Sequence, residues 1–133
     1  DEDNLSYKIQ DVRETNLENM SFCISMFTFQ FLPEKDRLNL MKKIFDNLVD
    51  GGAFVITEKV FSNNSKIQNM MEFMYYDFKR KSFSEKEILD KEQSLRNMAN
   101  YFTEEELMSY YSQHFKVSVF WRNLNFIGLL CRL

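Results

Sequence analysis

Residues 21–57 read SFCISMFTFQFLPEKDRLNLMKKIFDNLVDGGAFVIT, and this stretch decides the fold. Residues 21–27 form an almost continuously apolar run, which indicates a strand buried on both faces, as in a parallel sheet. Pro33 opens a helix with apolar residues at three- and four-residue spacings. Those apolar residues are Leu38, Met41, Ile44, Phe45 and Leu48. The glycines at 51–52 end the helix and residues 53–57 form the next strand, so the stretch predicts a right-handed βαβ unit.

The chain after this unit predicts three more helices. Residues 67–78 carry Met and Phe at helical spacings, and residues 85–98 form a more charged helix with a thinner apolar stripe. Thr103 and Glu106 have the spacing of a capping box, so the last helix begins there.

The two ends of the chain add strands. Residues 6–10 predict a short strand, and residues 115–121 and 125–132 predict two strands joined by a polar turn at 122–123. Strands this close in sequence pair antiparallel. The predicted fold class is α/β, with a mostly parallel sheet that ends in an antiparallel hairpin, which resembles the Rossmann-like class I methyltransferase fold. We expect one domain over residues 1–133, with a helical insertion at about 66–98.

Composition narrows the class of partner. The chain has 133 residues, 44% of them hydrophobic, and a formal net charge of −3. A nucleic-acid-binding face needs many cations on one surface, and no basic tail or long basic run is present. A small-molecule substrate or a protein partner fits better, and the 14 Phe residues suggest large apolar surfaces that need a partner.

The cysteines, the single histidine and the lengths of the apolar stretches indicate the expected compartment and exclude a standard metal site. Cys23 and Cys131 lie in apolar runs and are expected to be buried, reduced thiols. Two Cys and one His do not make a standard zinc site, so no metal is expected. No stretch is long and apolar enough to span a bilayer and no signal peptide is visible, so a cytoplasmic location is expected.

Several short motifs follow one another in a recognisable order. They are Asp11-Val12-Arg13, residues 27–32 (FTFQFL), Gly51-Gly52-Ala53, Glu58-Lys59, Asp77-Phe78-Lys79-Arg80, and Trp121 followed by Asn125-Phe126-Ile127-Gly128. In order and spacing these motifs resemble the carboxy-S-adenosyl-L-methionine synthases, over about residues 7–132 and over the C-terminal half of that family only. The resemblance implies S-adenosyl-L-methionine (SAM) as cofactor and prephenate as co-substrate. It also implies a product that feeds tRNA wobble-uridine modification, and a homodimer with the helical insertion near its interface.

The resemblance also implies positions for the cofactor. Asp11 and Val12 occupy the family's adenine-contacting pair, where a carboxylate accepts from the exocyclic amine and an aliphatic side chain covers the ring. From the residues alone, Asp11 is read first as the cap of a turn, because Asp is common in turns. Met26 stands where the family has a cofactor-contacting Asn, and a thioether lines a pocket without donating amide hydrogen bonds.

Glu92 occupies the position of the family's Arg that holds the extra carboxylate of the product. A carboxylate repels a carboxylate, and Arg is favoured at such sites for its bidentate geometry. An alternative register places Gln93 there, and Arg96, one helical turn onward, is a possible substitute. A plain methyltransferase of unknown acceptor, or an inactive interaction module, are therefore kept as alternatives.

Other polar residues leave their roles open. His114, the one His, is expected at a helix end rather than as a general base, and no catalytic residue is assigned. Tyr75, Tyr76 and Asp77 are expected either to line the substrate side or to pack on a second subunit.

The class I methyltransferase fold usually begins with two strands, and a Gly-rich loop connects the first of them to its helix. No stretch of this chain is expected to form these elements. We therefore expect residues 6–10 to lack a neighbouring strand and residues 21–27 to form an exposed apolar edge.

Overall fold

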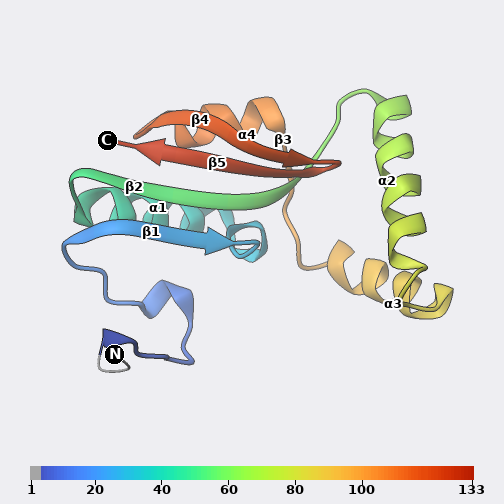
Figure 1. The fold of residues 1–133 in the computed structure, drawn as a ribbon, viewed down its shortest axis with the longest axis horizontal. Coiled ribbons are helices and arrows are strands. Elements are labelled where there is room, and N and C mark those ends of the chain that lie inside the picture. Colours follow the sequence, from blue (N-terminus) through green and yellow to red (C-terminus); the bar gives the residue numbers. More distant parts are fainter. Residues whose placement is uncertain (1–3) are drawn as a thin grey trace.

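The computed structural model describes residues 4–133, and its centre is one mixed β-sheet (Figure 1). The strands run in the order β1 (Met20–Met26), β2 (Leu48–Phe61), β5 (Phe126–Arg132) and β4 (Lys116–Asn123), and β3 (Phe102–Thr103) pairs with the end of β2. Strands β1 and β2 are parallel, whereas β5 runs antiparallel to both β2 and β4. The predicted α/β class, with a parallel unit followed by an antiparallel hairpin, is confirmed.

Helix α1 (Glu34–Asn47) connects β1 to β2, as the apolar spacing predicts. Pro33 is its N-cap, but the helix ends before the glycines, because Leu48 already has an extended backbone. Gly51 instead supplies a positive φ of 77° inside the long strand β2. Gly52 is needed for close approach, since a Cβ there would lie 2.8 Å from the carbonyl oxygen of Val49.

The buried face of α1 shares Met41 and Ile44 with the predicted one but adds Leu40 and Arg37, while the predicted Phe45 is only half-buried. Leu40, Met41 and Ile44 are buried, but Leu38 is exposed and Arg37 takes the inward position. Polar partners described below hold the buried Arg37 guanidinium. Hydropathy alone therefore placed Leu38 in the core instead of the adjacent Arg37.

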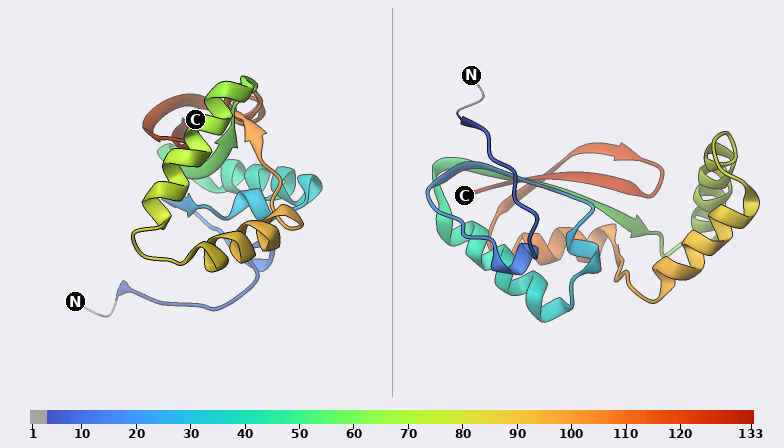
Figure 2. Two further views of the ribbon diagram at one scale, coloured as in Figure 1. Left: turned by 90° about the vertical axis from the view of Figure 1, so that its right-hand side faces the viewer. Right: turned by 90° about the horizontal axis from the view of Figure 1, so that it is seen from below.

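The sheet is covered on one face only. In Figure 2 (right), α1 and α4 (Glu104–Tyr111) lie together on one side of the sheet. The core between them and the strands includes Phe54, Ile56 and Leu129. On the opposite face, Phe22 and Ile24 of β1 and Phe120 and Trp121 of β4 are exposed; we call this surface the bare face.

Strand β1 ends the sheet, and within residues 4–133 it pairs only with β2. The expected exposed, apolar edge is therefore confirmed. Residues 6–10 contain no strand, so that prediction is wrong. A strand needs ladder hydrogen bonds from a neighbour, and the described part of the chain offers these residues none.

Two details of the C-terminal part were also predicted wrongly. The hairpin between β4 and β5 turns at Leu124 and Asn125 rather than at 122–123, and Leu124 has φ 50°. The short strand β3 was not predicted, because two residues carry no periodicity.

Helices α2 (Ser65–Lys79) and α3 (Glu85–Arg96) form an arm that projects beyond the carboxyl ends of β1 and β2, at the right of Figure 1. Helix α2 buries none of its residues and α3 buries only Ile88. The capping box at Thr103 and Glu106 starts α4 as predicted, and a second one, at Ser84 and Glu87, starts α3. The arm occupies the residues expected for the helical insertion at 66–98, and its being an insertion stays a prediction.

Candidate functional site

The carboxyl ends of β1 and β2 are the edge at which ligands bind in open α/β sheets. Met26 is the last residue of β1, and the chain then turns through Phe27, which has φ 50°. The Phe27 amide donates to Thr57 O at 2.9 Å, and Thr28 Oγ1 donates to Met26 O at 3.0 Å. These bonds fix the loop that leads from β1 to α1, so the edge next to Met26 has a defined shape.

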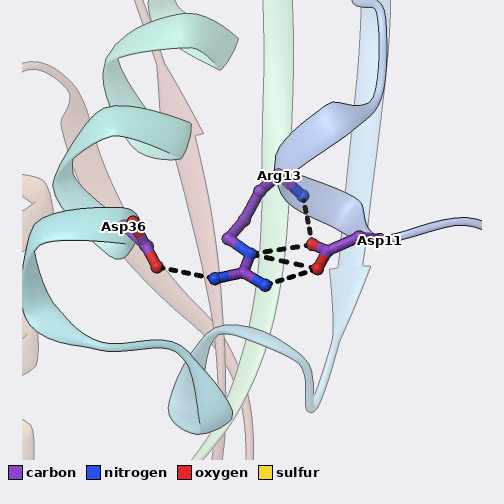
Figure 3. Close-up of polar contacts among 3 residues, drawn as sticks. All are labelled: Asp11, Arg13 and Asp36. Carbon is purple, nitrogen blue, oxygen red and sulfur yellow. Dashed lines mark hydrogen bonds and ion pairs between the residues drawn. The ribbon is translucent and has the colours of Figure 1, made fainter.

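Asp11 lies in a small ionic network with Arg13 and Asp36 (Figure 3). Arg13 Nη2 is 2.5 Å from Asp11 Oδ2, and Arg13 Nη1 is 3.1 Å from Asp36 Oδ2 at the start of α1. Asp11 also caps the short helix η2 (Val12–Glu14) by accepting from the Arg13 amide at 2.9 Å. The hydrogen bonds from the Arg13 side chain have the largest effect on the Asp11 pKa, and the bond from the Arg13 amide has the next largest. Together they lower the pKa of Asp11 to about 2, so this carboxylate is ionised at neutral pH.

The turn-capping role of Asp11 is therefore present, and its adenine contact stays a prediction. The other two expected cofactor contacts do not face the same way. Val12 is half-buried and packs against the core, whereas Met26 is 61% exposed and belongs to the bare face by strand alternation. The structure leaves the roles of Val12 and Met26 as predictions.

A buried ion pair lies beneath this edge of the sheet. Arg37 Nη2 is 2.9 Å from Glu58 Oε2, and both side chains are at most 1% exposed. Tyr111 donates to Glu58 Oε1 at 2.8 Å, and Arg37 Nε donates to Phe29 O at 2.7 Å. Burial raises the pKa of Glu58, and the nearby guanidinium opposes that shift. This network locks α1, β2 and α4 together below the candidate site.

Sequence reasoning missed this network, although it contained one usable signal. Glu58 continues the alternation that puts Phe54 and Ile56 on one face of the strand, and a carboxylate on a buried face needs a buried partner. The partner, Arg37, sits 21 residues away, so no local pattern identifies it. Gln30 adds a further tie by accepting from the Lys59 amide at 2.8 Å.

The arm brings a second set of polar residues to the same edge. Glu92 pairs with Lys79, with 3.1 Å between Oε1 and Nζ, and both side chains are half-buried. The expected carboxylate-recognition position therefore carries an internally neutralised acid. Gln93 and Arg96 are exposed on α3, and no contact ties either of them to a carboxylate in the described part of the chain.

Tyr75, Tyr76 and Asp77 take different positions. The Tyr75 ring packs edge-on against Phe126 of β5 at 5.1 Å between centroids, and Tyr76 is half-buried. Asp77 is exposed and pairs with Arg80 at 2.7 Å. Tyr75 thus lies at the end of the sheet, against β5.

The remaining candidates from the sequence are structural. His114 is half-buried beyond the end of α4, with its ring centroid 5.5 Å from that of Phe45. Both cysteines carry free thiols, but only Cys131 is buried as expected, and Cys23 is half-buried. Burial raises the pKa of Cys131 to about 12. Among residues 4–133 no group of three potential metal ligands lies together. None of the helices described is long and apolar enough to cross a membrane.

Solved structures with this arrangement are methyltransferases. The complex of DhpI with SAM and HEP superposes with a TM-score of 0.63 at 12% identity, covering 98% of this chain and 59% of that one. Human N-acetylserotonin methyltransferase superposes with a TM-score of 0.60 at 12% identity, covering 94% of this chain and 32% of that one. The chain therefore has the fold of the SAM-dependent methyltransferases, which shows the architecture alone.

Sequence comparison identifies more similar relatives. The chain is 40% identical over 89 residues to the carboxy-S-adenosyl-L-methionine synthase of Shewanella frigidimarina, and 42% identical over 89 residues to that of Shewanella piezotolerans. Each match covers 66% of this chain and 37% of the relative, so it spans little more than a third of each relative's length. No family model matches the chain. The chain thus resembles the carboxy-S-adenosyl-L-methionine synthases over this region.

Proposed function

We propose that this chain forms the C-terminal part of a SAM-dependent transferase of the carboxy-S-adenosyl-L-methionine synthase type. The observation that carries the proposal is the 40% identity over 89 residues to a relative with that name. The finer function is the reaction of SAM with prephenate to give carboxy-SAM for tRNA wobble-uridine modification. The half-buried pair of Glu92 and Lys79 keeps a plain methyltransferase as the alternative, because a neutralised acid stands where a cation is needed.

The residues present fit one end of the cofactor. The ionised Asp11 carboxylate is the proposed acceptor for the exocyclic amine of adenine, and the half-buried Val12 beside it is the proposed aliphatic cover of the ring. The three glycines of the chain lie in β2 and β5, so none belongs to a loop between a strand and a helix. The groups around the methionine end would then come from a segment beyond these residues.

In this proposal catalysis is mostly placement. SAM supplies an activated sulfonium when it is bound, and the protein aligns donor and acceptor. The Arg37–Glu58–Tyr111 network would hold the loop after β1 and the carboxyl end of β2 in fixed positions.

Two surfaces support further polypeptide contacts. The bare face and the edge of β1 fit the segment that completes the sheet, because an unpaired strand edge is a template for another strand. Exposed apolar residues on α2, including Met70 and Phe73, fit the proposed homodimer. An interaction module without activity is the competing function, favoured by the same bare face, and SAM binding separates the two.

The role of Asp11 is tested in a chimera. The chimera keeps the part of the Shewanella frigidimarina relative that precedes the matched region. The present chain replaces the matched region and all residues of the relative after it. Asp11→Ala is expected to raise the Kd for SAM about tenfold, the effect of losing one hydrogen bond to a charged group. Asp46→Ala removes an exposed carboxylate paired with Lys42 and serves as the matched control. Equal affinity of the Asp11→Ala and Asp46→Ala chimeras, measured by calorimetry, would remove Asp11 from the cofactor site.

A further inference from the structure

Lys59 is an unpaired cation at the carboxyl end of β2. Its side chain is half-buried, and within residues 4–133 its Nζ has neither a hydrogen-bond nor an ion-pair partner. The Nζ lies 5.1 Å from the centroid of the Tyr101 ring and 5.8 Å from that of Tyr75. Burial lowers the pKa of Lys59, so the site is poorer in water than an ordinary surface lysine. A partly desolvated ammonium without a partner is a group that a ligand would satisfy.

The second lysine at this position is already neutralised. Lys79 Nζ lies 4.2 Å from the Tyr75 centroid and 3.1 Å from Glu92 Oε1. Two ammonium groups therefore flank one aromatic ring, but only Lys59 lacks an acid. We call these five residues the Tyr75 cluster: Lys59, Tyr75, Lys79, Glu92 and Tyr101.

The surrounding charges limit what the cluster can bind. Glu72 accepts from Gln68 at 2.8 Å and acts on Lys59 only through space, as does Glu92. Arg96 is exposed on α3. Lys59 is thus the ammonium of the cluster that has no direct acidic partner, and a single carboxylate would pair with it. A phosphate dianion needs more donors than a single ammonium provides.

The rest of the cluster is aromatic. The Tyr75 ring contacts Phe126 edge-on at 5.1 Å and stacks on Phe78 at 6.5 Å. A ligand that places a carboxylate on Lys59 would therefore lay its carbon skeleton against aromatic rings. From these contacts we propose that Lys59, between Tyr75 and Tyr101, binds the carboxylate of a small organic acid at the carboxyl end of β2. The inference rests on the proposed function and deepens it, because it assigns a residue that would position the carboxylate substrate of that reaction.

The test follows each lysine by NMR in the 133-residue chain, with phenylacetate as the probe and no SAM present. A carboxylate stabilises the ammonium form, so phenylacetate is expected to shift the Lys59 side-chain signal saturably and to raise its pKa. Lys81, which is exposed in the turn between α2 and α3, is the internal control. Equal, unsaturable responses of Lys59 and Lys81 would overturn the proposal.

Two further arms sharpen the result. Lys59→Gln is expected to weaken phenylacetate binding about tenfold, whereas Lys81→Gln leaves it unchanged, with the backbone amide spectrum as the check of folding. Inorganic phosphate is expected to give no saturable shift at Lys59, and a response as strong as that to phenylacetate would overturn the assignment to a carboxylate. Because SAM is absent, failure here leaves the SAM-binding test of the proposed function intact.

Discussion

Replacement of Arg37 by Ala is expected to lower the free energy of unfolding by about 3–5 kcal/mol, because it leaves the Glu58 carboxylate buried without its counter-ion. Lys42→Ala is the matched control, since Lys42 pairs with Asp46 in an exposed position where a pair contributes less than about 1 kcal/mol. Urea unfolding followed by circular dichroism measures both. Similar losses in the two variants would mean that the Arg37–Glu58 pair does not hold the fold.

The same variants give a pH dependence with a defined sign. Burial raises the pKa of Glu58 above that of an unfolded Glu, and loss of the guanidinium raises it further. The folded Arg37→Ala protein therefore binds a proton that the unfolded chain releases, so its deficit is expected to grow as pH rises from about 4 to about 8. The double variant Arg37→Met, Glu58→Gln removes both charges and is expected to cost less than Arg37→Ala at neutral pH.

Phe54→Ala is expected to cost about 3–5 kcal/mol, as for other buried Phe side chains. Phe54 is fully buried in β2, and its ring lies about 6 Å from those of Phe29, Tyr111 and Phe115. Phe22→Ala, on the neighbouring strand but on the bare face, is expected to cost less than about 1 kcal/mol in the isolated chain. Chemical unfolding of the two variants compares the two faces of the sheet directly.

The chimera turns this contrast into a test of the bare face. If a further segment covers that face, the cost of Phe22→Ala is expected to rise above its value in the isolated chain, while the cost of Phe54→Ala stays the same. An unchanged, small cost of Phe22→Ala in a folded chimera would show that the face stays bare there.

The sequence predicted the elements that depend on local patterns. The apolar run of residues 21–27 and the spacing after Pro33 defined β1 and α1, and the capping box at Thr103 placed the start of α4. Prediction failed where the outcome depends on a distant partner. Residues 6–10 have the composition of a strand but no neighbouring strand to pair with in the described part of the chain. Arg37 is buried in place of the predicted Leu38 because it forms an ion pair with Glu58 of β2.

The same distinction between local patterns and distant partners applies to the candidate site. Asp11 and Glu92 were placed by resemblance, and the structure adds that each already has a cationic partner, Arg13 and Lys79 respectively. Lys59 was quoted as part of a motif but assigned no role. Its importance arises from the rings of Tyr75 and Tyr101, which reach it only in the folded chain.

The most direct test of the central claim is a calorimetric titration of SAM into the 133-residue chain and, in parallel, into the chimera. We expect no measurable binding by the chain and micromolar binding by the chimera, because residues 4–133 would hold only the adenine end of the cofactor. Micromolar binding by the chain alone would contradict the division of the site between two segments. A folded chimera that fails to bind SAM would contradict the assignment of this chain to a SAM-dependent transferase.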